Sequence, residues 1–265
     1  MNKMCVVSLV LLASISALSA QNELDEHFKN FRGTIVVHDQ KSNIYTIFNE
    51  ERAKTRYSPF STYKIPHSII ALETRVISDT DQIVRWDEQA YPREDWWPKT
   101  WGGEHNLKSA IKYSVVPVYR HIAKQIDREK MKSYVASFDY GNRDISFGTD
   151  NFWLNGSLRI SALEQIEFLK KFYNGQLKVS PRTIKLVKSI LIQEQTEDYT
   201  LSAKTGGGNM GGDQRAALGW YVGYVEKSDN VYFFALNIEG QNFTEILEPR
   251  LEITKNVLEE LGIVK

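Results

Sequence analysis

The stretch Ser58-Pro59-Phe60-Ser61-Thr62-Tyr63-Lys64-Ile65-Pro66 lies where a turn-forming sequence gives way to the apolar run Ile69-Ile70-Ala71-Leu72. If a helix begins at Ser61, Lys64 lies one turn further on and on the same face, because residues three apart in a helix are neighbours. A serine hydroxyl becomes an effective nucleophile only when a nearby base takes its proton. Free lysine has a pKa of about 10.4, so Lys64 can supply that base only if it is neutral or chemically altered.

This Ser-x-x-Lys spacing does not identify a nucleophile by itself, because it recurs at Ser109 and Lys112. For either pair the simpler interpretation is a capped helix start followed by a solvent-facing lysine. The rest of the chain therefore has to distinguish the two pairs.

Composition describes an ordinary globular protein. The 265 residues suffice for one or two domains, and 25% of them are charged. The 33 basic and 33 acidic residues cancel, which argues against nucleic acid as a partner, since that would need a basic face.

The N-terminus has the pattern of a cleaved export signal. Met1-Asn2-Lys3 is a short positive region, and the apolar run 4–18 is shorter than the roughly 20 residues that a membrane span needs. Cleavage fits best after Ser19 and nearly as well after Ala20. We expect residues 1–20 to be a signal peptide, and the mature protein to be periplasmic, soluble and without a membrane anchor.

Metal and thiol chemistry have no support in the sequence. Cys5 is the only cysteine and lies within the predicted signal, so the mature chain has no disulfide and no thiol nucleophile. The five histidines show no metal-ligand spacing. We expect no metal.

The order of elements predicts an α/β fold of the α+β type, with an antiparallel sheet flanked by helices and an additional all-helical lobe. Residues 21–265 form one domain, with a sheet lobe at about 21–57 and 193–265 and a helical lobe at about 58–192. The cleft between the lobes is the natural place for a site. The predicted strands cover 33–39, 44–48, 200–204, 217–226 and 231–238, and the predicted helices cover 61–72, 106–113, 116–126, 128–138, 161–174, 181–192 and 250–261.

A second motif, Lys204-Thr205-Gly206 followed by Gly207, ends one of these predicted strands. An ammonium and a hydroxyl at that place can bind a carboxylate, and the glycines let a ligand approach the backbone closely. Ser-x-x-Lys, Ser-Asp-Asn and Lys-Thr-Gly together are typical of penicillin-recognising serine enzymes. Ser228-Asp229-Asn230 follows Lys204 in a hairpin turn, so Ser114-Val115-Val116 is the better candidate for the middle motif.

With these motifs in order, the sequence resembles the class D β-lactamases (oxacillinases) over nearly the whole mature chain. The matching stretches are Ser61-Thr62-Tyr63-Lys64, Tyr113-Ser114-Val115-Val116-Pro117-Val118, Tyr140-Gly141-Asn142, Phe152-Trp153-Leu154, Lys204-Thr205-Gly206, Leu158–Ser161 and Gly219–Glu226. Tyr63 stands where phenylalanine is common in the family. Gly207 stands where an aromatic residue often follows, which implies a different cleft shape on that side.

The resemblance implies a role for each matching residue. Ser61 would form an acyl-enzyme with the lactam carbonyl. Lys64 would be N-carboxylated by CO2, with no other cofactor, and would then serve as general base. Trp153 would donate its indole N–H to that carbamate, and Ser114 would relay a proton to the lactam nitrogen.

Binding roles follow in the same way. Lys204, Thr205 and Gly206 would bind the substrate carboxylate, with Arg250 as a second cation. The backbone N–H groups of Ser61 and Gly207 would form the oxyanion hole. Val116 and Leu154 would be apolar walls that control access to Lys64.

The function that the resemblance implies is an exported serine β-lactamase, a hydrolase that opens the ring of penicillins and confers β-lactam resistance. Oxacillin-type and other β-lactams would be further substrates. The partners would be small β-lactam antibiotics, and a homodimer is compatible with the family. Two alternatives share the motifs: a β-lactam sensor domain that is acylated without turnover, and a penicillin-binding peptidase.

Overall fold

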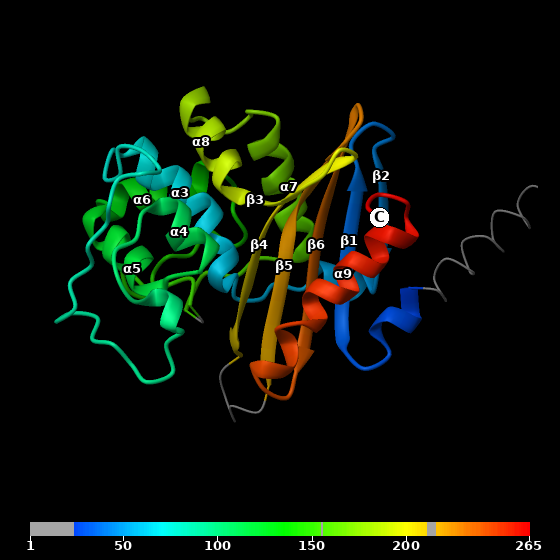
Figure 1. The fold of residues 1–265 in the computed structure, drawn as a ribbon, viewed down its shortest axis with the longest axis horizontal. Helices are drawn as coiled ribbons and strands as arrows, with labels where there is room; N and C mark the ends of the chain where they lie inside the picture. The colour runs from blue at the N-terminus through cyan, green and yellow to red at the C-terminus, as the bar shows by residue number, and fades with distance from the viewer. Residues whose placement is uncertain (1–23, 155, 211–215) are drawn as a thin grey trace, which may run out of the picture.

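The computed structural model describes residues 24–154, 156–210 and 216–265 (Figure 1). The predicted signal peptide and its cleavage site lie outside this range. Within the described part of the chain, no helix combines the length and the apolar character needed to cross a bilayer.

The sheet is antiparallel and built from both ends of the chain, as the sequence predicts, and it has six strands. Its order is β2-β1-β6-β5-β4-β3, so the first strand lies beside the last, with Ile35 opposite Leu236. Short turns join β1 to β2 and β5 to β6 (Figure 1). The strands are β1 (Arg32–Asp39), β2 (Ile44–Phe48), β3 (Ile192–Gln195), β4 (Tyr199–Asn209), β5 (Ala217–Lys227) and β6 (Asn230–Gly240).

Helices lie on both faces of the sheet and beyond its β3–β4 edge. In Figure 1, α9 crosses the near face, α7 lies behind the strands, and α3, α4, α5 and α6 form a separate group beside β4. The helices are α2 (Glu50–Lys54), α3 (Lys64–Glu73), α4 (Leu107–Lys112), α5 (Val116–Gln125), α6 (Arg128–Ser137), α7 (Ala162–Tyr173), α8 (Pro181–Leu191) and α9 (Pro249–Glu260), with 3-10 turns η1 (Phe60–Tyr63), η2 (Lys99–Trp101) and η3 (Thr244–Ile246).

Local sequence signals explain where several helices begin. Ser161 and Glu164 form a capping box at the start of α7, and Ser180 caps α8 with Pro181 in its first turn. The structure confirms both predicted helix starts: α7 begins at Ala162, directly after its cap Ser161, and α8 begins at Pro181.

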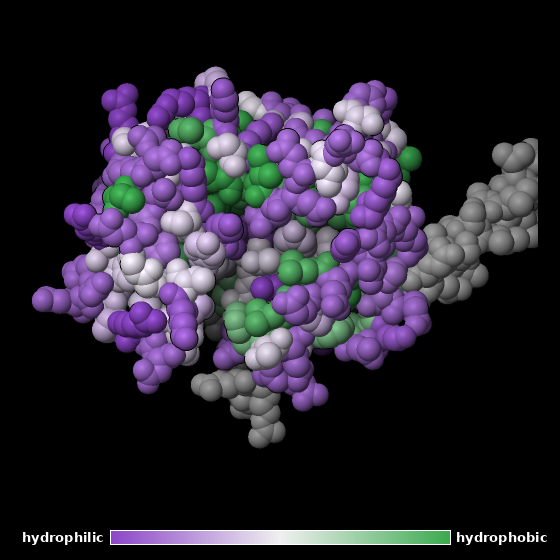
Figure 2. Space-filling view, in the orientation of Figure 1, coloured by the Kyte–Doolittle hydropathy of each residue, from purple (hydrophilic) through white to green (hydrophobic). Residues whose placement is uncertain are grey.

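The alternation of side chains along the strands divides the core in two. Ile35 and Val37 face one side, where they join the cluster that includes Ile253 and Val257 of α9. Val36 faces the other side and belongs to the larger cluster under the helices. On the face drawn in Figure 2, hydrophobic side chains gather near α8 and β3, and the surface is hollowed between the helices and the sheet.

Two predicted boundaries are wrong. The helix expected at Ser61 begins at Lys64, because Pro66 has no N–H to donate and is tolerated only in the first turn. Strand β4 does not end near Lys204 but continues to Asn209, since its glycines still pair with β5, as Gly207 does with Gly219. The sequence also missed α2 and β3.

Candidate active site

Ser61 lies in η1, and the residues before it are held by hydrogen bonds. Phe60 has a positive φ of 47°, and its N–H donates to the carbonyl of Trp153 at 3.0 Å. The Ser58 hydroxyl donates to the same carbonyl at 3.0 Å, while Trp220 of β5 donates its indole N–H to the Ser58 carbonyl at 2.9 Å. The turn that presents Ser61 is therefore fixed by both the Trp153 loop and the sheet.

Lys64 contacts Ser61 directly. Its Nζ donates a hydrogen bond to Ser61 Oγ at 2.7 Å and lies 5.2 Å from the ring centre of Tyr119. The Lys64 side chain is fully buried, and this burial, with the nearby charge of Lys204, lowers its pKa well below the usual value. The environment therefore favours a neutral amine beside the serine hydroxyl.

Two further basic side chains belong to this region: Lys204, whose charge acts on Lys64, and Arg250, whose charge acts on Lys204. The buried Lys204 Nζ donates to the Thr205 carbonyl at 2.9 Å and to the Thr205 Oγ1 at 3.3 Å. Burial and the charge of Arg250 lower the pKa of Lys204 to about 7. In the described part of the chain, no carboxylate forms an ion pair with Lys64, Lys204 or Arg250, so the site is electropositive and suited to an anion.

Glycines allow strand β4 to lie against η1. A Cβ on Gly206 would stand 2.9 Å from both the Pro59 carbonyl oxygen and Thr62 Cγ2. A Cβ on Gly208 would stand 2.4 Å from the Phe60 ring. This close approach, which only glycine permits, brings the strand that carries Lys204 and Thr205 against the turn that carries Ser61.

Trp153 closes the site from the helical side. Its ring is fully buried. It stacks against the Tyr63 ring, with 5.4 Å between ring centres, and meets the His67 ring edge-on, with 5.1 Å between ring centres. Its Nε1 has no hydrogen-bond partner among the described residues. A buried donor without an acceptor is rare, and this one marks a place where an acceptor can bind.

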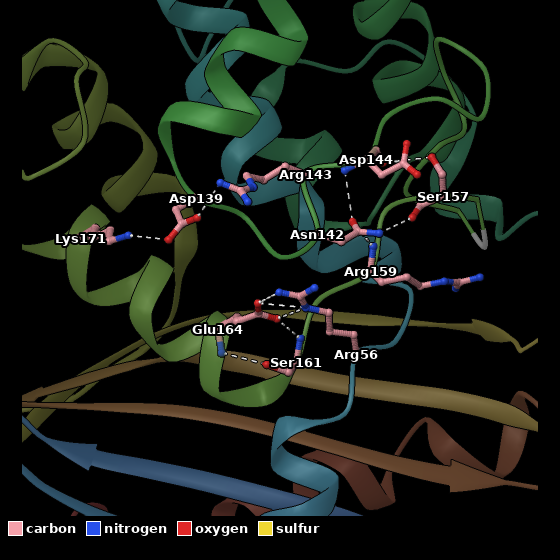
Figure 3. A network of polar contacts seen from close by, with 10 residues as sticks. All are labelled: Arg56, Asp139, Asn142, Arg143, Asp144, Ser157, Arg159, Ser161, Glu164 and Lys171. Carbon is pink, nitrogen blue, oxygen red and sulfur yellow. Dashed lines mark hydrogen bonds and ion pairs between the residues drawn. The ribbon is translucent and has the colours of Figure 1, made fainter.

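The Tyr140-Gly141-Asn142 motif holds the loop that carries Trp153. Figure 3 shows the Asn142 side chain between Ser157 and Arg159; it donates to the Ser157 carbonyl at 2.8 Å and accepts from the Arg159 N–H at 2.9 Å. Gly141 has a φ of 56°, and a Cβ there would overlap the Arg159 carbonyl. This motif therefore fastens the two ends of the loop together.

Ser114 lies in the bend between α4 and α5, with a positive φ of 58°. The preceding carbonyl, of Tyr113, accepts a hydrogen bond of 2.8 Å from the Trp101 indole. No hydrogen bond joins Ser114 to Ser61 or Lys64 within the described residues. Val116 and Leu154 are partly buried and pack at the margin of the larger core cluster.

The second Ser-x-x-Lys pair, Ser109 and Lys112, and the Ser228-Asp229-Asn230 string both have structural roles. Ser109 completes a capping box with Asn106 at the start of α4, and Lys112 is exposed. Asp229 lies in the β5–β6 turn and pairs with Lys41. Among the described residues there is no group of three or more histidine, cysteine, aspartate and glutamate side chains that could hold a metal ion.

Sequence reasoning missed one residue in this site. His67 is fully buried, one turn after Lys64 on α3, and contacts Trp153 and Tyr119 through its ring. Its spacing from Lys64 could have indicated it, because residues three apart share a helix face.

Comparison with known proteins gives one consistent result. Residues 32–259 match the family described as the penicillin binding protein transpeptidase domain. Beta-lactamase OXA-48 of Klebsiella pneumoniae is 38% identical, covering 100% of each chain. The crystal structure of a class D beta-lactamase from Sebaldella termitidis has a TM-score of 0.84 and 37% identity, covering 93% of this chain and 97% of that one.

A relative of a different kind shares the same region. The methicillin resistance mecR1 protein of Staphylococcus aureus is 33% identical over 98% of this chain, but the match covers only 45% of that protein.

Proposed function

The chain belongs to the class D β-lactamases, and from that premise we propose which of its residues carry out the hydrolysis of the β-lactam ring. The observation that carries the proposal is the hydrogen bond of 2.7 Å between the fully buried Lys64 Nζ and Ser61 Oγ. A buried amine whose pKa is lowered is neutral, and in that form it can take the serine proton or be converted into a group that does so. Ser61 is then the nucleophile.

Lys204 and Thr205 bind the carboxylate of the penicillin, with Arg250 as a second positive charge. The support is the absence of any carboxylate partner for these cations in the described part of the chain, together with the burial of Lys204. The backbone N–H groups of Ser61 and Gly207 stabilise the oxyanion, because η1 and β4 lie in contact at Gly206. Each such donor contributes roughly 3–4 kcal/mol to transition-state stabilisation in measured hydrolases.

Lys64 fits a covalent group derived from CO2. Its neutral amine can bond to the carbon of CO2 with loss of one proton, which supplies a carboxylate base for the Ser61 proton. The Trp153 N–H, which has no partner among the described residues, donates to that carboxylate. This unsatisfied donor is the feature of the site that supports an N-carboxylated Lys64.

The proton and water steps use the residues around this pair. The Ser61 oxygen attacks the lactam carbonyl, the C–N bond breaks, and Ser114 passes a proton to the departing nitrogen. A water molecule then attacks the ester carbonyl, which releases the penicilloate and restores the Ser61 hydroxyl. Val116 and Leu154, at the margin of the core, form the apolar walls that limit access of water to Lys64.

We also propose export to the periplasm through residues 1–20, on the strength of the apolar run 4–18. Mass spectrometry of the protein purified from the periplasm should find the mature chain beginning at Ala20 or Gln21.

Two copies can pair along β3, because this strand lies at the sheet edge and all four of its residues are exposed. Light scattering on the purified protein tests that dimer.

A turnover assay separates the enzyme from its alternatives. The similarity to mecR1 makes a sensor domain the main alternative, and a sensor or peptidase would open only one equivalent of β-lactam per protein molecule and remain acylated. We expect many turnovers of benzylpenicillin, a raised resistance of cells that express the gene, and a rate that increases with added bicarbonate.

The two Ser-x-x-Lys pairs provide a matched control. Ser61→Ala should abolish hydrolysis, whereas Ser109→Ala should lose only the side-chain half of the α4 capping box, a hydrogen bond worth about 1 kcal/mol of stability, because Asn106 remains the N-cap. Equal activity of Ser61→Ala and the wild type would refute the assignment of the nucleophile.

A further inference from the structure

His67 is a buried polar residue that the reaction as described above does not use. It lies three residues after Lys64 on α3 and has no exposed surface. Neither of its ring nitrogens, Nδ1 or Nε2, has a hydrogen-bond partner in the described part of the chain. An unsatisfied buried polar group costs about 1–3 kcal/mol, so a missing partner at this position needs an explanation.

The side chains around His67 cannot supply that partner. The Tyr63 hydroxyl donates to Met131 Sδ at 3.2 Å. The Tyr119 hydroxyl shares a hydrogen bond of 2.8 Å with Ser68 Oγ. The aromatic rings of both tyrosines therefore pack against the imidazole while their polar groups are occupied elsewhere.

The indole of Trp153, like the imidazole of His67, has no hydrogen-bond partner among the described residues. The two rings meet edge-on at 5.1 Å, yet no hydrogen bond joins them, and the Trp153 Nε1 is equally unsatisfied. His67 lies one turn after Lys64 on α3, where the charge of that lysine acts on it, and the Lys64 Nζ lies over the Tyr119 ring that the imidazole also contacts. Two rings in contact, both with unsatisfied nitrogens and one of them a helical turn from this amine, indicate that the missing element is an acceptor attached to Lys64.

His67 keeps one N–H available at any working pH. Burial, and secondarily the charge of Lys64, lower the pKa of its imidazole to about 3. A neutral imidazole carries one N–H donor and one acceptor nitrogen. A buried carboxylate needs several donors, since its two oxygens offer about four acceptor positions and an uncompensated charge is costly.

We propose that His67 is a positioning residue that donates a hydrogen bond to the carboxylate formed when CO2 adds to Lys64, alongside the indole of Trp153. The inference rests on the proposed N-carboxylation of Lys64. It assigns His67 the task of retaining CO2 on the lysine rather than of contacting the substrate.

The test measures CO2 affinity directly, without relying on activity. The wild type and variants are freed of CO2, titrated with ¹³C-bicarbonate, and followed by the ¹³C NMR signal of the lysine carbamate. His67→Phe retains an aromatic ring but removes the N–H, and should bind CO2 at least about tenfold more weakly, since a hydrogen bond to a charged group is lost. Thermal unfolding of each variant shows that the fold is retained.

Two amide variants separate hydrogen bonding from packing. His67→Asn places an N–H near the position of Nδ1, and His67→Gln places one near Nε2. One of them should restore most of the CO2 affinity, which also identifies the donating nitrogen. Loss in all three variants would mean a packing role and would overturn the proposal.

A matched control tests whether the effect is specific to His67, and the wild-type signal distinguishes failure of the carbamate proposal from failure of the His67 role. His105 is another buried histidine with an unpartnered Nε2, and its ring stacks against Trp86 in place of Trp153. His105→Phe should leave CO2 affinity unchanged. No carbamate signal in the wild type would refute the proposed function itself, whereas a wild-type signal with unchanged affinity in His67→Phe would refute only the role of His67.

Discussion

Arg250 donates a hydrogen bond of 2.6 Å from its NH1 to the carbonyl of Gly206, 44 residues earlier in the chain. This bond ties the first turn of α9 to the strand that carries Lys204. It also holds the guanidinium charge near Lys204, where it contributes to the lowered pKa of that amine. The cation that the resemblance implied as a carboxylate ligand therefore also adds to the effect of burial on the pKa of Lys204.

The first prediction concerns the pH dependence of kcat/KM for penicillins. The pKa of Lys204 is about 7 in the free protein, so its positive charge is lost as the pH rises through this value. The attraction for the substrate carboxylate should then weaken, and kcat/KM should decline above about pH 7, mainly through KM. Initial rates at several substrate concentrations across the pH range, at saturating bicarbonate, measure kcat/KM and KM as functions of pH.

A penicillin methyl ester is the control for that decline, because it has no carboxylate to bind. Its kcat/KM should be lower throughout and should not show the same fall. A parallel fall for the ester would assign the titration to another group.

Replacement of Arg250 should change both affinity and pH profile. Arg250→Ala should raise KM about tenfold, as expected for the loss of a charged contact of roughly 1.4 kcal/mol. The decline of kcat/KM should move to higher pH, because the charge that lowers the pKa of Lys204 is gone. Arg182→Ala is the matched control, since Arg182 also donates to a backbone carbonyl, that of Ser78 at 2.9 Å, but from α8. An unshifted profile in Arg250→Ala would contradict the coupling.

Stability should rise with pH between about 7 and 9 when CO2 is excluded. The pKa of Lys204 is about 7 in the folded chain and 10.5 for an ordinary lysine, so within this interval the unfolded chain binds a proton that the folded chain does not. By linkage the free energy of unfolding then increases with pH, by at most about 1.4 kcal/mol per pH unit for one group. The destabilising effect of burying the charged amine is fully present below pH 7.

Urea denaturation of the wild type and Lys204→Met measures this dependence. The variant should be more stable at pH 7, and its stability should rise less steeply with pH. Equal slopes in the two proteins would show that Lys204 does not titrate in this range.

Trp153→Phe should slow deacylation more than acylation. Phenylalanine preserves most of the packing against Tyr63 but removes the indole N–H, which has no other partner among the described residues. An acyl-enzyme should therefore accumulate on Ser61 and be visible by mass spectrometry after mixing with substrate. Trp86→Phe is the control, because the Trp86 Nε1 is also buried and unpartnered but lies beside His105. Equal loss in both steps for Trp153→Phe would remove the role assigned to its N–H.

Much of the fold could be predicted because its signals are local. Capping residues, proline positions and the alternation of apolar residues depend on the nearest turns of the chain, so α7, α8 and the β5–β6 hairpin were predicted within one or two residues. Among the strands that were predicted, β4 has the end that was most wrong, because its glycine-rich end has a weak strand propensity. Its pairing with β5 and its contact with η1 outweigh that propensity, and both involve residues distant in the sequence.

The sequence by itself determined which residues are available for chemistry: a Ser61–Lys64 pair, Lys204 beside Thr205, and a tryptophan between them. Spacing along the chain could not separate Ser61 and Lys64 from Ser109 and Lys112. The tertiary structure decided that, because it buries Lys64 completely and leaves Lys112 exposed. Burial lowers the pKa of an amine only when distant segments exclude water from it, so the lowered pKa of Lys64 exists only in the folded chain.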